Sequence, residues 1–371
     1  MARALQVIST GGMYGAERVL LELSRFLNDN GWDSQILAID GAGAAPLVAA
    51  ARRMGMRAEL FGERDIGAWS GAKRLASYLE EHSIDLVHSH GYKPDILLAA
   101  SGQPRRRVCV ATCHSWYSDT LKMRAYEWLD KRCLRFFDQV VAVSDEILQD
   151  LLGNAVSAMR LSMISNGLDA IQPADQARLV IRRQLEVGPE ELLVVRVGRL
   201  MATKGNDLLL RALASLNRSD WRLAFVGAGD QQPVLEALAA SLDVAAKVRF
   251  CGFQDNVADY LAAADLFVSP SLQEGLPMVL LEAMAAGLPI LSTSVGQIPK
   301  VMQDDHDGLL IAPGEVDALH AALARLMASP WDRERWSAQA RRTYAARFSR
   351  GAMGGAYLRL YDDALQRSQI E

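Results

Sequence analysis

The sequence predicts an α/β protein made of two domains, each built on a parallel sheet. Three observations lead to this prediction. The chain has 371 residues, which exceeds an ordinary single core and fits two domains. Short apolar segments alternate with amphipathic segments in both halves, a pattern typical of parallel sheets with helices on both faces. A polar stretch with two prolines, roughly 168–190, separates the halves and is the predicted hinge.

The predicted strands follow the same scheme in each half. In the first half they are 4–9, 34–39, 58–61, 85–90, 107–114, 139–144 and 161–167. In the second half they are 192–198, 221–227, 247–253, 265–270, 289–293 and 308–312. The intervening segment 15–31 is amphipathic and stops at Gly31, a natural helix end. From about 331 to 371 the pattern predicts two helices and no further strand.

Composition excludes several classes of protein. The formal net charge of −4 argues against a nucleic-acid binder, which normally carries a basic excess. The cysteines are scattered, which predicts reduced thiols in a cytoplasmic protein without a disulfide framework or zinc site. No segment approaches the roughly 20 apolar residues of a membrane span, and the N-terminus does not resemble a signal peptide. We therefore expect a cytosolic chain that at most lies on a membrane.

Ligands of open α/β sheets bind beyond the carboxyl ends of the strands, so the expected site is a cleft between the domains. The loop after strand 265–270 carries Glu274, and Pro277 suits the first turn of the following helix. The backbone N–H groups of the helix start form an anion site with the positive end of the helix dipole. They belong to Leu276, Met278, Val279 and Leu280.

Glu282 lies one to two turns into that helix, where it can accept hydrogen bonds from a vicinal diol such as ribose. Glu274, before the helix, lies where a second hydroxylated group would bind. Together they predict a phosphate flanked by two sugars. The alternative interpretation is a core helix with a solvated Glu282.

Two cations follow the strand 192–198. Arg199 and Lys204 lie five residues apart at the carboxyl end of this strand and suit a diphosphate. A guanidinium can donate two parallel hydrogen bonds to a phosphate, and an ammonium acts as a point charge. The alternative is an exposed pair of surface charges. In the first half, Gly11, Gly12 and Gly15 follow the first strand and let backbone N–H groups approach an anion. A plain turn is the alternative.

Histidines end two strands of the first half. His114 ends strand 107–114, where it could hydrogen-bond a substrate hydroxyl, although a lone histidine is more often structural. His88 and His90 are predicted to alternate across their strand, so that only one of them faces the site.

The segment 121–137 is a candidate membrane contact. At about 100° per residue, its basic residues share one face around Trp128, beside an apolar stripe. The basic residues are Arg124, Lys131, Arg132 and Arg135, and the stripe is Leu121, Ala125, Leu129 and Phe136. Such a face suits an anionic lipid surface. A solvated face and a site for an acceptor's phosphate are the alternatives.

Several motifs together resemble glycosyltransferase family 4. "EGLPMVLLE" looks like the E-x7-E motif of retaining glycosyltransferases, and "VGRLMATKG" resembles their G-R-L…K-G segment. "GGMYGAERV", "DLVHSHG", "CVATCH", "ISNGLD", "FVGAGD" and "VRFCGF" also follow the order of the family, so the resemblance covers nearly the whole chain.

The resemblance implies the GT-B fold: two facing Rossmann-like domains, an interdomain cleft, and a last helix crossing back to the first domain. It places an acceptor-side domain at 1–168, a donor-binding domain at 190–350 and the returning helix at 351–371. It implies retaining transfer of a sugar from a UDP- or GDP-sugar to a glycan or lipid-linked acceptor.

 Bacterial members of the family mostly build surface polysaccharides or lipopolysaccharide, and that is the setting we expect here.

Carried over residue by residue, the resemblance implies a role for each matching position. Arg199 and Lys204 hold the diphosphate, and Glu282 binds the donor ribose. Glu274 and the backbone at Gly275 and Leu276 contact the donor sugar, Phe253 lies near the base, and His114 touches the sugar and the reaction centre. The early loop with Gly12 and Gly15 closes over the diphosphate.

Two segments depart from the family pattern. The family usually has G-G-x-P-E where this chain reads "GQIPK", so Gln297 and Lys300 leave the role of that loop open. The early loop is extended relative to the shorter family form, so the glycine that meets the phosphate is also open.

No D-x-D motif occurs at a predicted strand end, so we expect no metal ligands and no cofactor, with cationic residues stabilising the leaving group instead. Two other functions remain open from the sequence. A sugar-nucleotide 2-epimerase shares the two-domain architecture, and a non-catalytic two-lobed sugar-binding protein is the second alternative.

Overall fold

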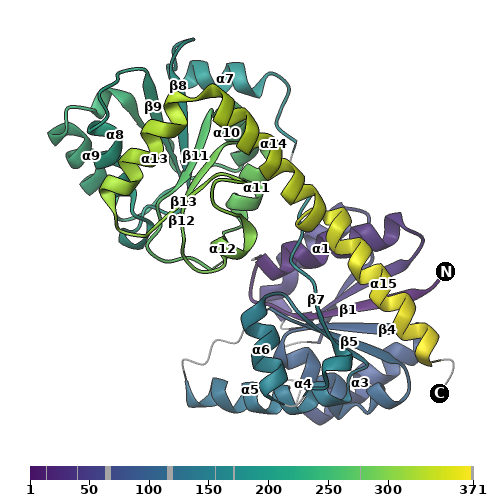
Figure 1. Ribbon diagram of the computed structural model, residues 1–371. Helices are drawn as coiled ribbons and strands as arrows, with labels where there is room; N and C mark the ends of the chain where they lie inside the picture. Colours follow the sequence, from purple (N-terminus) through teal and green to yellow (C-terminus); the bar gives the residue numbers. More distant parts are fainter. Residues whose placement is uncertain are drawn as a thin grey trace. The chain divides into compact units, whose positions relative to one another are not determined.

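The chain forms two compact units, unit 1 (Met1–Asp169 with Arg347–Glu371) and unit 2 (Ala170–Ala346) (Figure 1). The structure is a computed structural model. It describes all residues except 14, 40, 63–67, 115–119, 155, 170–171, 276 and 369–371.

Unit 1 is built on a seven-stranded sheet in the order β3-β2-β1-β4-β5-β6-β7, with every neighbouring pair parallel. Its strands are β1 (Arg3–Ser9), β2 (Asp33–Ile39), β3 (Ala58–Phe61), β4 (Leu86–His90), β5 (Val108–Cys113), β6 (Gln139–Ala142) and β7 (Leu161–Met163). Its helices are α1 (Gly15–Asp29), α2 (Ala45–Arg53), α3 (Ala68–Glu81), α4 (Tyr92–Ala100), α5 (Leu121–Cys133), α6 (Asp145–Gly153) and α15 (Arg350–Ser368). The order of the strands reverses between β1 and β4, which is where such sheets bind ligands.

Unit 2 is built on a six-stranded sheet in the order β10-β9-β8-β11-β12-β13, again entirely parallel. Its strands are β8 (Leu192–Val197), β9 (Trp221–Val226), β10 (Val248–Phe250), β11 (Leu266–Ser269), β12 (Ile290–Thr293) and β13 (Leu309–Ile311). Its helices are α7 (Ala177–Gln184), α8 (Asn206–Ala214), α9 (Gln232–Ser241), α10 (Val257–Ala263), α11 (Met278–Ala286), α12 (Ile298–Val301), α13 (Val316–Ala328) and α14 (Pro330–Arg347). Here the order reverses between β8 and β11.

Each of the predicted strand segments contains a strand, so the α/β prediction is confirmed. The central strands are buried along their whole length, as β4 and β5 show, because helices cover both faces of each sheet. This burial explains why the strands read as nearly continuous apolar runs.

The predicted return of the last helix to the first domain is also confirmed. Helix α15 packs against α1, and a Cβ on Gly354 would lie 2.3 Å from the ring of Phe26, so only glycine fits at this crossing. Arg350 at the start of α15 lies 3.9 Å from Glu22 and 3.4 Å from Asp29. The last helix is therefore part of the core of unit 1.

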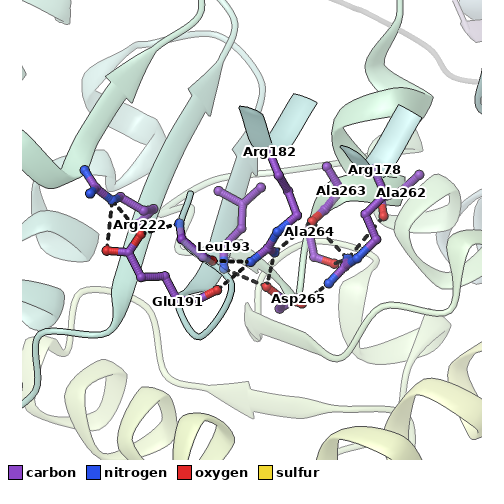
Figure 2. Close-up of polar contacts among 10 residues, drawn as sticks. Arg178, Arg182, Glu191, Leu193, Arg222, Ala262, Ala263, Ala264 and Asp265 are labelled. Carbon is purple, nitrogen blue, oxygen red and sulfur yellow. Dashed lines mark hydrogen bonds and ion pairs between the residues drawn. The ribbon is translucent and has the colours of Figure 1, made fainter. Parts of the chain in front are cut away.

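The polar stretch predicted as a hinge contains α7, which is fixed to the sheet of unit 2 (Figure 2). Arg178 and Arg182 each place a guanidinium nitrogen 2.7 Å from a different oxygen of Asp265. The backbone N–H of Leu193 donates to the same carboxylate at 2.8 Å. Burial alone would raise the pKa of Asp265, but these hydrogen bonds hold it below its ordinary value.

Candidate functional site

In unit 2 the structure brings together Lys204 and Glu274, which the sequence analysis placed on different loops. Lys204 follows β8, Glu274 follows β11, and its carboxylate lies 2.6 Å from the Lys204 ammonium. The Ser271 hydroxyl donates to the same carboxylate at 2.8 Å. Both charged side chains are mostly buried, with exposed fractions of 16% and 12%. An ammonium has three donors, so this pair leaves Lys204 able to bind a further anion.

Close backbone contacts hold the loops that carry these residues. A Cβ on Gly205 would lie 2.1 Å from the Pro270 carbonyl oxygen, and Gly205 has a φ of +60°, so glycine is required there. A Cβ on Gly296 would lie 2.1 Å from the Glu274 carbonyl oxygen. The N–H of Gln297 donates to the Gly275 carbonyl at 3.1 Å. The loop that departs from the family pattern therefore supports the backbone at Glu274 and Gly275.

Arg196 is a further buried cation that interacts electrostatically with Glu274 and that the sequence analysis did not single out. It lies in the buried strand β8 and is 2% exposed. One guanidinium nitrogen donates to the Val197 carbonyl, whereas Nε and Nη2 have no hydrogen-bond partner among the described residues. Burial lowers the pKa of Arg196 to about 10, and Glu274 opposes this shift. An arginine inside an apolar strand is the sequence feature that would have identified it. The sequence analysis considered only Arg199, which is exposed after the strand.

The isolated charge of Arg196 leads to a stability prediction. We expect Arg196→Met to raise the free energy of unfolding of the ligand-free protein by about 1 kcal/mol, because apolar side chains often stabilise where they replace a buried ion. Denaturant unfolding at pH 7 measures this change. The exposed Arg199→Met should leave the free energy of unfolding within about 0.5 kcal/mol of wild type. A clear loss of stability in Arg196→Met would show that its charge is already compensated.

Helix α11 differs in detail from the predicted anion site. Pro277 is the residue before the helix, in an extended conformation, rather than a member of its first turn. The Leu280 N–H donates to the Pro277 carbonyl at 2.9 Å, so it is not free for an anion as predicted. Met278 and Val279 lie half-buried in the first turn, whose N–H groups have no acceptor within the helix. Leu276 lies outside the described residues.

Glu282 is half-buried in the second turn of α11. It lines a cavity of about 240 Å³ together with Arg341 of α14 and residues of α10 and α11. The other lining residues are Gln172, Pro173, Ala258, Leu261, Ala262, Ala285 and Ala286. Glu282 thus lines a mostly apolar hollow that also holds Arg341 and Gln172, while its helix neighbours Leu281 and Ala283 are buried in the core.

Phe253 follows β10 and is 75% exposed. It comes directly after Gly252, which has a φ of +67° and accepts a hydrogen bond from the Gly227 N–H at 2.8 Å. An exposed aromatic ring at a strand end offers a flat apolar face to a planar ligand.

In unit 1 His114 directly follows β5, and its Nε2 lies 3.2 Å from Nδ1 of His90. The prediction that His88 and His90 point to opposite faces is wrong. Their rings lie 4.1 Å apart and both side chains are buried. Residues two apart in a strand share one face, so the two histidines form a cluster with His114.

The early loop of unit 1 adjoins a hollow of about 470 Å³ at the reversal between β1 and β4. The hollow is lined by Ser9, Thr10, Gly11, His90, Gly91, Tyr92, Lys93 and Pro94. The Thr10 hydroxyl accepts a hydrogen bond from the Gly12 N–H at 3.1 Å, which shapes the loop. Gly15 is exposed and begins α1, with open space where a Cβ would stand.

Helix α5 and the turn directly after it, Leu134–Phe136, expose much of the predicted surface. Leu121 is 83% exposed, Trp128 58% and Phe136 56%, and the Arg132 guanidinium lies 4.4 Å from the centre of the Trp128 ring. The prediction that Lys131 joins the basic face is wrong. Its ammonium lies 2.6 Å from Glu127 and 2.6 Å from Asp150, and its side chain is only 11% exposed.

Comparisons with known proteins identify the family. The sequence model described as "Glycosyl transferases group 1" matches residues 178–343, and the one described as "Glycosyltransferase Family 4" matches residues 13–171. The D-inositol 3-phosphate glycosyltransferase of Saccharomonospora viridis is 30% identical over 329 residues, which cover 80% of this chain and 74% of that protein. The chain belongs to glycosyltransferase family 4.

This family 4 protein is accordingly a retaining glycosyltransferase that uses a nucleotide-sugar donor, which decides against the epimerase and the sugar-binding protein. The lipopolysaccharide core biosynthesis glycosyltransferase LpsE of Rhizobium meliloti is 34% identical over 181 residues, covering 49% of this chain and 53% of that protein. The structure of Anabaena HepE in complex with UDP superposes with a TM-score of 0.81 at 20% identity, covering 98% of this chain and all of that one. The GT-B fold expected from the resemblance is confirmed.

The described residues contain neither a metal-ligand cluster nor a membrane-spanning helix. No group of three or more His, Cys, Asp or Glu side chains is placed to hold a metal ion in the part of the chain that the structure describes. Asp305 and Asp307 have D-x-D spacing, but they precede β13, and Asp307 accepts a hydrogen bond from the Thr343 hydroxyl at 2.7 Å. No helix within the described ranges has the length and apolar character needed to cross a membrane.

Proposed function

We propose that this enzyme transfers a sugar from a UDP-sugar to a glycan or lipid-linked acceptor during synthesis of a cell-surface polysaccharide or lipopolysaccharide. The UDP complex of HepE supports the choice of nucleotide, and the 34% identity to LpsE supports the class of acceptor. We place the enzyme in the cytoplasm, on the inner face of the membrane.

The buried pair of Lys204 and Glu274 is the observation that carries this proposal. During transfer, the bond between the anomeric carbon and the diphosphate oxygen breaks, and the diphosphate leaves with additional negative charge. Lys204, Arg199 and the N–H groups of Met278 and Val279 stabilise that charge. Glu274 and the Gly275 backbone contact the sugar, with Lys204 fixing the carboxylate.

The remaining predicted residues complete the proposal. Glu282 binds the ribose from its hollow, and the exposed Phe253 stacks on the base. On unit 1, His114 binds a sugar hydroxyl, and the loop with Gly12 and Gly15 covers the diphosphate. Catalysis is independent of divalent metal, because the cations of the protein take the role that a metal would otherwise have.

A donor screen tests this function. A thermal-shift panel of UDP-, GDP- and ADP-sugars is expected to raise the melting temperature most with a UDP-sugar, since a ligand that binds only the folded state stabilises it. Release of UDP that depends on an added acceptor, with retention of anomeric configuration, then establishes transfer. Stabilisation by GDP-sugars alone would overturn the choice of donor.

Glu282→Gln is expected to weaken binding of UDP by roughly 1–3 kcal/mol, the scale of a hydrogen bond to a charged group. The amide keeps the shape of the side chain but loses the charge that accepts from the ribose diol. Isothermal titration with UDP measures the change, and the exposed Glu236→Gln of α9 is the matched control. Unchanged affinity in Glu282→Gln would remove Glu282 from the donor site.

The exposed face of α5 gives the proposed membrane contact. We expect the enzyme to sediment with vesicles containing anionic lipid at low salt and to dissociate at high salt, because the exposed Arg124, Arg132 and Arg135 surround an exposed Trp128. Trp128→Ala should weaken this binding severalfold, whereas Trp331→Ala should not.

Trp331 is a matched control because it is 68% exposed and also has an arginine over its ring, with the Arg335 guanidinium 5.3 Å from the ring centre. Binding that is insensitive to salt, or equally weakened by both substitutions, would contradict a lipid contact through α5.

A further inference from the structure

A continuous chain of hydrogen bonds, partly buried at His114 and buried beyond it, joins His114 to the last helix within unit 1. His114 Nε2 lies 3.2 Å from His90 Nδ1, and His90 Nε2 lies 2.9 Å from Oε1 of Gln6 on β1. Gln6 Nε2 donates to the Tyr361 hydroxyl of α15 at 3.2 Å. Strands β1, β4 and β5 and helix α15 thus each contribute to one network.

The network continues from the Tyr361 hydroxyl on its other side. His88 Nδ1 lies 2.5 Å from that hydroxyl, and His88 Nε2 lies 2.7 Å from the Thr112 hydroxyl. Thr112 in turn lies 2.8 Å from the hydroxyl of Tyr357. Because these side chains are buried, each hydrogen must find an acceptor within the network.

The orientation of the Gln6 amide fixes the direction of every hydrogen bond toward His114. A carboxamide oxygen only accepts, so His90 carries its hydrogen on Nε2. Burial lowers the pKa of His90, so this ring is neutral and its Nδ1 is an acceptor. His114 must therefore donate to His90 through Nε2. Burial lowers the pKa of His114 to about 4, so this ring is also neutral and has no hydrogen on Nδ1.

The Gln6 amide directs its nitrogen toward Tyr361 and its oxygen toward His90. Burial raises the pKa of Tyr361, so the phenol keeps its single hydrogen. Because the Tyr361 oxygen already accepts from Gln6, that hydrogen goes to Nδ1 of His88, the other partner of the hydroxyl. The opposite branch ends on hydroxyl groups, which adapt to either direction.

We propose that Gln6 and His90 are positioning residues that hold His114 as the Nε2–H tautomer and so leave its Nδ1 as a hydrogen-bond acceptor for a substrate hydroxyl. The use of that acceptor rests on the proposed function, in which His114 binds a sugar hydroxyl. The tautomer itself rests only on the network. If His114 carried its hydrogen on Nδ1, that nitrogen would be a donor and could not accept a hydrogen bond from a substrate hydroxyl.

The tautomer is measurable without any assay of activity. Long-range ¹H–¹⁵N correlation of the ¹⁵N-histidine-labelled full chain at pH 7 distinguishes a protonated ring nitrogen from an unprotonated one, and His114→Gln assigns the His114 signals by their loss. We expect a protonated Nε2 and an unprotonated Nδ1. A protonated Nδ1 in the wild-type protein would mean that the chain of donors runs in reverse, and would overturn the proposal.

Two substitutions of His90 test its part in the network. His90→Leu removes the acceptor, so we expect His114 to become a mixture of both tautomers and kcat/KM to fall by about tenfold, the loss of one directed hydrogen bond. His90→Asn places an amide oxygen near the former Nδ1, so we expect it to restore the Nε2–H tautomer and most of the lost kcat/KM.

The outcomes separate this proposal from the proposed function. An unchanged His114 tautomer in His90→Leu would overturn the role of His90, whatever the enzyme transfers. Full activity of His114→Gln would instead remove His114 from the sugar site while leaving its tautomer as assigned. If His90→Leu does not fold, as circular dichroism reports, the wild-type spectrum and His90→Asn still decide the tautomer.

Discussion

Lys204→Met is expected to lower kcat by about 10²–10³ at saturating donor, the usual effect of removing one group that stabilises charge in the transition state. The ammonium is mostly buried beside Glu274, so its field is only weakly screened by water. Its loss also leaves the Glu274 carboxylate without its cation, facing a leaving group of the same charge. Initial rates of UDP release with a saturating acceptor measure the effect.

The matched control is Lys73→Met, which removes an exposed lysine on α3 and should leave kcat within about twofold of wild type. The same account predicts that EDTA leaves the rate of the wild-type enzyme nearly unchanged. Loss of activity in EDTA with recovery on adding Mg²⁺ would assign the stabilising charge to a metal. A normal kcat in Lys204→Met would remove Lys204 from the transition state.

Asp265→Ala is expected to lower the free energy of unfolding of unit 2 by about 3 kcal/mol, because it leaves two arginines without their shared carboxylate. The Leu193 N–H also loses its acceptor at the start of β8. Figure 2 shows that the same cluster ties α7 to the strands, so helix α7 should become more accessible to proteolysis. Urea unfolding measures the change, with the exposed Asp255→Ala as the control.

The pH dependence of this difference has a definite sign. The pKa of Asp265 in the folded state lies below its ordinary value of 3.8, so its contribution to stability is fully present above that value. The contribution is lost as pH falls below 3.8 and through the lowered folded pKa. Wild type and Asp265→Ala should therefore differ at pH 7 and converge in acid. A constant difference across this range would contradict the ion-pair account.

The positions of the strands along the chain and of the cations after them could be predicted because they depend on local patterns. Buried parallel strands read as apolar runs, and residues such as Arg199 and Lys204 follow directly after one. The cluster of His88 and His90 was also predictable, since residues two apart share a strand face, and the opposite expectation came from a wrong application of that rule. The pairing of Lys131 was predictable only in part, because Glu127 lies one turn before it on the same helix but Asp150 lies on another helix.

Two parallel α/β domains, a resemblance to glycosyltransferase family 4, and the strand ends that carry the candidate site can be read from the amino-acid sequence. Which of these groups come into contact depends on the tertiary fold. The pairing of Lys204 with Glu274 joins loops 70 positions apart, and the bond between Gln6 and Tyr361 joins residues 355 positions apart. Such pairings follow from how strands are ordered in a sheet and which helix covers them. Most buried donors and acceptors find a partner there, however distant in sequence, because leaving one unpaired costs about 1–3 kcal/mol.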